Sequence, residues 1–384
     1  MRPDGDPILA HARRAGLLIL LTACTVPPVA AQGARTASGP FTRGKPLAEW
    51  EVQAEHYIPD LRREAVKAIA TLGPGAREAV PVLLRASRDQ DQEVRFWAVE
   101  ALGRVGADPK RVAPSLLSSM TTDTRPVQQA ARRALEALGA EATPLLLPAL
   151  DSHDAWVRAN AAEAIGVIGA APGPTVKRLG QLLADDSLWV RASAAWALGH
   201  LGLQAKGASK PLTVALEEEL RLDPTFHAPG QRLRVDNLCY ALGQIGKPAD
   251  RAVPALLSVF YDGGDSLRLA AQVALAAMGS KAAEPLGRAA REGRMPVRVA
   301  AAGALRLMGA EGKKAVPDLV KVLETTDELE GGHDLVIATA DALGAMGKSA
   351  RAARGVLERQ RKHSASPDVL AAVDRALRKI RLGA

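Results

Sequence analysis

The chain has 384 residues and a formal net charge of +8, and 47% of its residues are hydrophobic. That hydrophobic fraction is normal for a globular protein, and so small a charge says little about partners. Only 3% of the residues are aromatic. A core built mostly from Ala, Leu, Val and Gly suits closely packed helices, so composition favours an all-α fold. With Cys24 and Cys239 as the only cysteines, a disulfide framework is excluded.

The N-terminal segment has the layout of an export signal. Arg13 and Arg14 precede an apolar run over residues 15–23 that is too short to span a bilayer and is followed by small residues. We therefore expect residues 1–31 to be a signal peptide and the mature protein to be exported to the periplasm or cell envelope. The alternative is the apolar N-terminus of a cytosolic protein.

Two cleavage sites compete in this signal. Residues 21–24 (Leu-Thr-Ala-Cys) resemble the lipobox of bacterial lipoproteins, which would give a signal over residues 1–23 and a lipid anchor at Cys24. Residues 29–31 (Val-Ala-Ala) fit ordinary signal peptidase. Both remain open, and membrane contact is expected only through that anchor.

Residues 32–45 are rich in Gly, Ala, Ser, Thr and Arg and are expected to be a flexible linker, with order beginning near Pro46. The rest of the chain, residues 46–384, repeats one phrase: Trp-Val-Arg-Ala-Asn at Trp156 returns as Trp-Val-Arg-Ala-Ser at Trp189. With the Val of the phrase as position 0, apolar residues recur at positions 4, 7, 8 and 11. The ten copies start at Leu61, Val94, Val127, Val157, Val190, Arg234, Leu267, Val297, Leu335 and Val369.

Each copy predicts a helix with one apolar stripe, because positions 0, 4, 7, 8 and 11 lie on one face. Position 7 is Ala in all ten copies, which would let a second helix approach closely. Nine copies have Gly at position 12, where a left-handed residue ends a helix. A second apolar run containing Pro separates the copies, so each unit reads helix, turn, helix. Two units carry insertions, at residues 220–231 and 324–334.

The wording Val-Arg-x-x-Ala-Ala-x-Ala-Leu-Gly-x-Ile-Gly resembles the HEAT-like repeat, particularly the short version found in phycobilisome (PBS) lyases, here in a protein of bacterial cell-envelope type. The resemblance implies an alpha-alpha superhelix, a HEAT/ARM-type solenoid of about ten helical hairpins. It also implies a ladder of Asp–Arg contacts between repeats, made by the Arg at position 1. Asp91, Asp154 and Asp186 lie nearby as partner acids, whereas the alternative is a basic strip that binds phosphates. The position 1 arginines are Arg62, Arg95, Arg158, Arg191, Arg268 and Arg298.

In this repeat family the second helices line the inner, concave wall, where positions 2 and 6 point away from the apolar stripe. In a solitary solenoid these positions should be charged, but in this chain they are mostly apolar or aromatic between Trp196 and Val299. An exposed apolar patch indicates an interaction site, so we expect a protein or peptide partner there. The alternatives are an insertion folded over the patch or a wrong helical register. The candidate partner-binding residues are Phe96, Trp196, Asp236, Tyr240, Leu269, Val273 and Val299.

The sequence contains no recognisable catalytic motif, phosphate-binding loop or cysteine pair, so we predict no catalytic, cofactor-binding or metal-binding residues and no cofactor. Acidic residues of the second insertion could hold a divalent cation, but a solvated acidic loop is the expectation there. We therefore predict a non-catalytic scaffold. The first alternative is a bilin-lyase-like or other enzyme-associated HEAT-repeat protein. The second alternative is a nucleic-acid-binding protein, although no nucleic-acid partner is expected. The acidic loop contains Asp327, Glu328, Glu330, His333 and Asp334.

Overall fold

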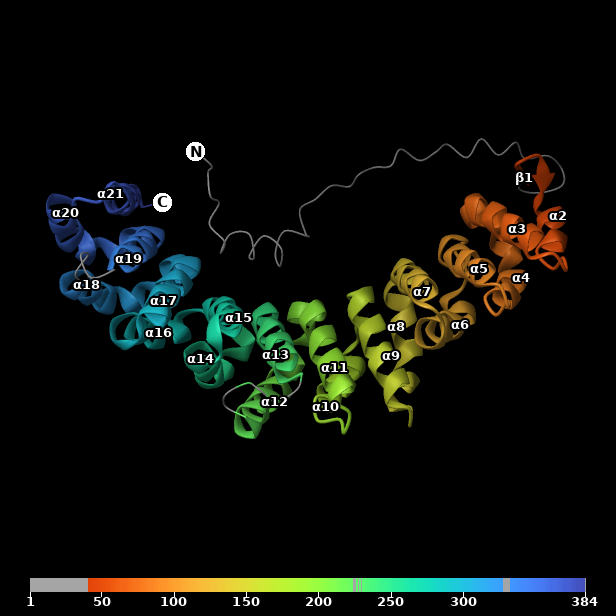
Figure 1. Ribbon diagram of the computed structural model, residues 1–384, viewed down its shortest axis with the longest axis horizontal. Helices are drawn as coiled ribbons and strands as arrows, with labels where there is room; N and C mark the ends of the chain where they lie inside the picture. The colour runs from red at the N-terminus through yellow and green to blue at the C-terminus, as the bar shows by residue number, and fades with distance from the viewer. Residues whose placement is uncertain (1–40, 224–225, 227, 229, 327–331, 384) are drawn as a thin grey trace. The chain divides into compact units, whose positions relative to one another are not determined.

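The computed structural model describes residues 41–223, 226, 228, 230–326 and 332–383 (Figure 1). The expected signal peptide over residues 1–31, with Cys24, lies outside the described residues. The chain divides into two compact units, one ending at Leu138 and the other beginning at Gly139. Each unit is described by itself below.

The described part of unit 1 begins inside the region that we expected to be a linker. Residues 41–45 do not continue that linker, because β1 (Phe41–Thr42) pairs antiparallel with β2 (Lys45–Pro46). The hairpin is held by Trp50 of α2 (Leu47–Gln53), whose side chain is 1% exposed and donates its indole N–H to the Thr42 carbonyl at 3.1 Å. The ordered chain therefore starts earlier than Pro46.

The rest of unit 1 consists of helical hairpins. The second helices of its hairpins stack in sequence, and the 3₁₀ segment η1 (Gly73–Ala79) leads from one hairpin into the next. The second helices are α3 (Pro59–Leu72), α5 (Gln92–Arg104) and α7 (Arg125–Leu138), and the first helices between them are α4 (Val80–Ala86) and α6 (Pro109–Thr122).

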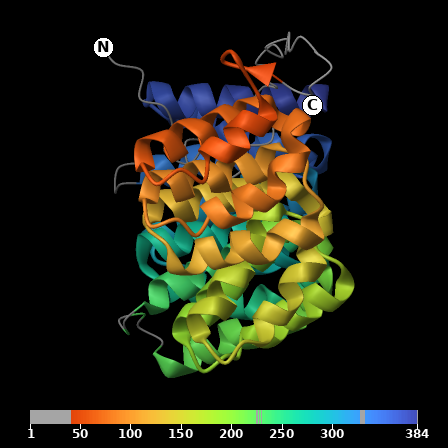
Figure 2. The same cartoon turned by 90° about the vertical axis from the view of Figure 1, so that its right-hand side faces the viewer.

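Unit 2 repeats the same arrangement with seven second helices. In its C-terminal part, drawn in blue in Figure 1, the second helices lie on the inner side of the curve and the first helices on the outer side. In the view turned by 90° (Figure 2), the C-terminal helix is seen along its whole length, so the helices lie across the direction in which the repeats follow one another. The second helices are α9 (Ala155–Ile168), α11 (Leu188–Leu201), α13 (Gln231–Ile245), α15 (Gly264–Ala277), α17 (Met295–Met308), α19 (His333–Ala345) and α21 (Pro367–Leu382).

The first helices of unit 2 are shorter on average and are often preceded by a 3₁₀ segment. These helices are α8 (Thr143–Leu146), α10 (Gly173–Leu182), α12 (Ser209–Leu222), α14 (Val253–Asp262), α16 (Ser280–Glu292), α18 (Val316–Thr325) and α20 (Arg354–His363). The 3₁₀ segments are η2 (Gly139–Ala142), η3 (Leu147–Asp151), η4 (Gly202–Ala208), η5 (Lys247–Ala252), η6 (Gly309–Ala315) and η8 (Gly347–Ala353). The predicted turn between hairpins is thus in most repeats a tight helical segment.

The ten predicted copies coincide with the ten second helices. The Ala at position 7 is at most 3% exposed in every copy. In five copies its neighbour is a Gly at position 9 of the preceding copy (Gly103, Gly166, Gly199, Gly243 or Gly344): a Cβ on Gly103 would lie 2.7 Å from the Cα of Ala134, and one on Gly344 would lie 3.0 Å from the Cα of Ala376. Successive second helices therefore approach backbone to backbone, which explains how a core with so few aromatic residues is filled.

The predicted helix ends are largely confirmed. All nine Gly residues at position 12 have positive φ, between 52° and 69°. Asp91, Asp154 and Ser366 accept hydrogen bonds from the first backbone N–H groups of their helices, as expected of N-caps. Ser187, the N-cap residue of α11, makes no such bond; instead its own backbone N–H donates to Asp185 at 2.9 Å.

Candidate functional site

The edge where the first helices meet the second helices carries the Asp–Arg ladder. In unit 2, the Arg158 guanidinium donates to both carboxylate oxygens of Asp185, at 2.8 Å and 2.7 Å, and to the carbonyls of Ser152 and His153, at 2.8 Å and 3.1 Å. One arginine therefore binds the turn before its own helix and also binds the next repeat. Such bidentate, charge-assisted bonds are among the stronger ones in proteins.

Unit 1 repeats this pattern twice. Arg62 binds Asp89 at 2.7 and 2.8 Å, and Arg95 binds Asp123 at 2.7 and 2.8 Å. The partner acids lie 27 or 28 residues after each arginine. The prediction of Asp91, Asp154 and Asp186 as partners was wrong, because the arginine reaches forward to the turn of the following repeat rather than to an acid of its own turn.

The ladder lowers the pKa of its aspartates. Partial burial raises the pKa of Asp185, but the hydrogen bond from Arg158, the backbone N–H of Ser187 and the positive charges of Arg158 and Arg178 outweigh that penalty, so the net pKa lies below its ordinary value. Asp89 and Asp123 show the same balance with their own arginines. All three carboxylates are therefore ionised at neutral pH.

The other position 1 arginines depart from the pattern. Arg268 binds Asp265 of its own helix at 2.6 Å, and Arg298 reaches Thr326 at 3.2 Å, 28 residues on, where an acid would stand in a regular rung. Five of the six arginines thus have protein partners, which supports the structural interpretation of this column over a phosphate-binding strip.

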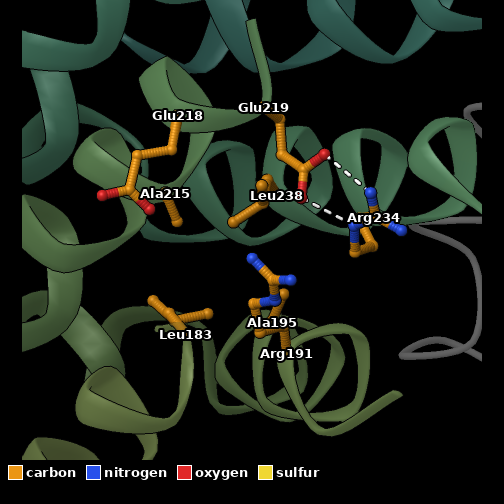
Figure 3. A pocket seen from close by; sticks show the side chains of 8 residues that line it. All are labelled: Leu183, Arg191, Ala195, Ala215, Glu218, Glu219, Arg234 and Leu238. Carbon is orange, nitrogen blue, oxygen red and sulfur yellow. Dashed lines mark hydrogen bonds and ion pairs between the residues drawn. The ribbon is translucent and has the colours of Figure 1, made fainter. Parts of the chain in front are cut away.

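The remaining arginine, Arg191, lines a small pocket with Leu183, Glu218, Glu219 and Arg234 (Figure 3). Its Nε is buried without a hydrogen-bond partner among the described residues. Glu219, 28 residues after Arg191, is instead bound by Arg234 at 2.6 Å and 2.9 Å. The pocket encloses about 10 Å³, roughly the space of one water molecule, so it does not hold an organic ligand.

The buried ion pair between Arg234 and Glu219 joins the two helices on either side of the first insertion. The usual Val-Arg of positions 0 and 1 is reversed to Arg234-Val235, so the arginine turns towards Glu219 of its own hairpin. Gln231, fully buried, donates to the carbonyls of Glu219 and Asp223 at 2.6 and 2.9 Å. The described parts of the 220–231 insertion are thereby fixed to α12 and α13. Of the acidic residues in the second insertion, Asp327, Glu328 and Glu330 lie outside the described residues.

The inner side of unit 2 carries the candidate binding surface, which we call the inner stripe. It comprises positions −1, 2, 6 and 10 of five neighbouring second helices, a spacing that keeps them on one face of each helix. These residues are Trp156, Ala159, Glu163 and Val167 of α9; Trp189, Ala192, Trp196 and His200 of α11; Leu233, Asp236, Tyr240 and Gln244 of α13; Ser266, Leu269, Val273 and Ala277 of α15; and Pro296, Val299, Gly303 and Leu307 of α17.

Two tryptophans form one end of the inner stripe. The rings of Trp156 and Trp189 stack with centroids 6.5 Å apart and planes 18° apart, and the two residues remain 46% and 53% exposed. Because large exposed aromatic residues are frequent at interfaces, this pair makes the inner stripe a candidate binding surface.

A second aromatic cluster lies further along the same helices. The ring of His200 lies 3.8 Å from that of Trp196 and 5.5 Å from that of Tyr240, measured between centroids. Trp196 lies on Gly166 and Tyr240 on Gly199, since a Cβ on either glycine would fall within 2.6 Å of the ring. The glycines of position 9 thus let these rings pack against the neighbouring helix, where Trp196 and Tyr240 are half-buried.

The structure brings six of the seven predicted site residues together on unit 2. Asp236 and Val273 are exposed, and Trp196, Tyr240, Leu269 and Val299 are half-buried. The seventh is separate: Phe96 belongs to unit 1, where its ring packs edge-on against Trp97 with centroids 5.2 Å apart.

Sequence reasoning missed positions −1 and 10 of the inner stripe, and with position 10 it missed His200. Trp156, Trp189 and Leu233 stand at position −1, and Leu233 is 54% exposed. A signal was available, because the repeated phrase itself opens with Trp. Only positions 2 and 6 were considered as facing outward, although position −1 lies seven residues before position 6 and therefore on the same face.

The charge of the inner stripe is one-sided. Among its twenty residues Glu163 and Asp236 are acidic, and none is Lys or Arg. Part of this charge is engaged within the protein, since Glu163 accepts a hydrogen bond from Ser193 at 3.2 Å. In the described part of the chain, no cluster of His, Cys, Asp and Glu could hold a metal ion, and no helix is long and apolar enough to cross a bilayer.

The geometry defines the class of the protein: an all-α helical repeat solenoid built from hairpins. The chain belongs to the HEAT-repeat family, because the family model of HEAT repeats matches residues 49–136, 127–199 and 143–221, and that of the PBS lyase HEAT-like repeat matches residues 297–325. A solved structure, the crystal structure of an engineered protein from the Northeast Structural Genomics Consortium, is 21% identical, with 87% of this chain and 98% of that chain covered and a TM-score of 0.43. A search of curated proteins found no match.

Proposed function

We propose that this helical repeat scaffold is non-catalytic and binds a protein or peptide along the inner stripe of unit 2. The observation that carries the proposal is the pair of open aromatic clusters, Trp156–Trp189 and Trp196–His200–Tyr240, on neighbouring helices. Aromatic side chains on a rigid helical wall bury large area at a small cost in conformational entropy.

The rigidity of the wall supports binding rather than chemistry. The position 9 glycines bring the inner helices into backbone contact, so the aromatic rings are held in place before a partner arrives. A preorganised surface loses little entropy on association. The enclosed pocket around Arg191, at about 10 Å³, is too small for a substrate.

A photocrosslinking amino acid at Val273, which is 39% exposed on the inner stripe, tests the proposal. In cells, Val273 is expected to capture one partner reproducibly, whereas the same label at Leu203, 65% exposed on η4 and outside the stripe, is not. Trp189→Ala should weaken binding of the captured partner by roughly 30-fold, the cost typical of an interface hot spot. Equal capture at both positions, or capture unaffected by Trp189→Ala, would refute the proposal.

We further propose that the protein acts outside the cytosol, on the basis of the N-terminal Arg pair, apolar run and small residues. Mass spectrometry of the mature N-terminus tests this. A chain beginning at an acylated Cys24 would mean a lipid anchor, one beginning at Gln32 would mean a released protein, and one retaining Met1 would refute export.

A further inference from the structure

We propose that one edge of unit 2 docks on a membrane surface that carries anionic lipid headgroups. This inference goes beyond the proposed protein-binding function, because it concerns a different face of the molecule. The edge is formed where the last repeats turn, by η6, by η8 and by residues 378–383 at the end of α21, and η8 packs against both of the others. We call it the basic edge, and its cations are Lys313, Lys314, Lys348, Arg351, Arg378, Lys379 and Arg381.

The cations of the basic edge are free to meet another molecule. All seven are exposed, and none of them has an ion pair or a side-chain hydrogen bond within the described part of the chain. They also come together in space, because a Cβ on Gly383 would clash with the side chain of Lys348, so η8 and the end of α21 are in direct contact. The basic edge is therefore one continuous surface of uncompensated positive charge.

The carboxylates of the same region are paired with other residues. Glu311, the one acid in η6, η8 and residues 378–383, binds Lys247 at 2.6 Å. The first helix α16, which packs against η6, has three cations and two carboxylates and so adds no negative charge. Five more carboxylates on α18 to α21 have ion pairs of their own, and these are Asp318, Glu324, Asp341, Glu358 and Asp374.

The remaining acids lie at the opposite ends of these helices. Asp334 and Asp368 stand in the first turns of α19 and α21, 10 or more residues and thus about 15 Å before the basic edge. The acidic insertion follows α18, whereas η6 precedes it, and this helix of 10 residues is about 15 Å long. These carboxylates are farther from the basic edge than the screening length of about 8 Å at physiological salt.

Helix stability does not account for this charge. η6 and η8 lead directly into the N-termini of α18 and α20, where the positive end of the helix dipole disfavours Lys and Arg. Lys313 and Lys314 nevertheless precede α18, and Lys348 and Arg351 precede α20. Four cations thus occupy positions that are unfavourable in the isolated protein, which favours a role in binding an anionic partner.

An exposed leucine and the form of the edge favour a lipid surface as that partner. Leu382 is 76% exposed and directly follows Arg381. Surfaces that bind membranes peripherally bury apolar side chains at headgroup level while their cations attract anionic lipids. Successive turns along one edge of a solenoid can also contact a flat surface simultaneously. A nucleic acid would use the same cations but would gain little from Leu382.

Co-sedimentation of the purified full chain with lipid vesicles tests the inference. Vesicles of equal parts phosphatidylcholine and phosphatidylglycerol should bind the protein, whereas vesicles of phosphatidylcholine alone should bind it much more weakly. The apolar run over residues 15–23 is present in both samples, so the difference between the two lipids reports the effect of charge. Added salt should reduce that difference, because the cations are exposed.

Two variants assign the binding to the basic edge. Combining Lys348→Gln, Arg378→Gln and Arg381→Gln should weaken binding to the mixed vesicles roughly 10- to 100-fold, since each cation near an anionic bilayer contributes about 1 kcal/mol. Leu382→Asn leaves the charge unchanged and should weaken it by about 3- to 10-fold. Far-UV circular dichroism verifies that each variant is folded.

A matched control separates the basic edge from the net charge of the whole chain. It removes three exposed cations of unit 2 that have no ion pair among the described residues, by Lys177→Gln, Lys210→Gln and Arg232→Gln, and should leave vesicle binding within about 3-fold. Equal losses in the two triple variants, or equal binding to both lipids, would overturn the inference. Tighter binding to a short DNA duplex than to the mixed vesicles, unaffected by Leu382→Asn, would overturn it in favour of a nucleic acid.

Discussion

Replacing Gly103 with Ala should destabilise the protein although the residue lies in a helix. An added Cβ would lie 2.7 Å from the Cα of Ala134 on the next inner helix, 0.7 Å short of the 3.4 Å at which ordinary contact begins. Overpacking of this kind costs about 1–3 kcal/mol, and the better helix propensity of Ala returns at most about 1 kcal/mol. We therefore expect a net loss of about 1–2 kcal/mol in the free energy of unfolding, measured by urea denaturation.

The same substitution elsewhere provides a graded series. A Cβ on Gly344 would lie 3.0 Å from the next helix and one on Gly243 would lie 3.1 Å away, so those variants should lose about 1 kcal/mol or less. Gly355 of α20 has nothing within 4 Å and should gain up to about 1 kcal/mol. If Gly103→Ala is as stable as the wild type, or the order of the series is reversed, close helix approach is not what position 9 requires.

Three further predictions concern buried or paired groups. Asp185→Asn should lower the free energy of unfolding by about 1–3 kcal/mol at pH 7, because the Arg158 side chain loses its charged acceptor. The pKa of Asp185 in the folded protein lies below the unfolded value of about 3.9. In denaturation with guanidinium chloride, the difference between variant and wild type should therefore shrink below about pH 4. Glu219→Gln should cost about 3–5 kcal/mol in thermal unfolding by leaving Arg234 charged and buried, and replacing both residues with Met should recover most of the loss; equal losses would contradict this. Burial raises the pKa of Cys239, so in a variant lacking the other cysteine a thiol reagent should react at the rate of unfolding, and fast labelling of the folded protein would refute the buried position.

The fold could be predicted because its information is local. Apolar positions 0, 4, 7, 8 and 11 fix the buried face of each second helix, and Gly at position 12 fixes its end, so all ten second helices followed from periodicity. The ladder partners could not be derived this way. An arginine such as Arg158 reaches an acid 27 residues on, and only the packing of one repeat on the next shows which turn it meets.

The inner stripe was only partly predictable for a similar reason. Trp196 and Tyr240 stood out because aromatic residues interrupt columns expected to be charged. Trp156 and Trp189 were read only as part of the repeated phrase, because the exposure of a residue in the first turn of a helix depends on what packs around that turn. The glycines at position 9, visible in the quoted wording, acquired a meaning only when their distances to the next helix were known.

The reversed pair Arg234-Val235 has a consequence for how the protein assembles. Ten near-identical hairpins invite mispairing, since each apolar face would accept almost any other. Because Arg234 binds Glu219 within its own hairpin, this hairpin offers no ladder acid at Glu219 to Arg191 of the preceding repeat, and its docking surface differs from those of its neighbours. This difference would distinguish that hairpin from the other copies of unit 2 and favour docking of the repeats in the correct order.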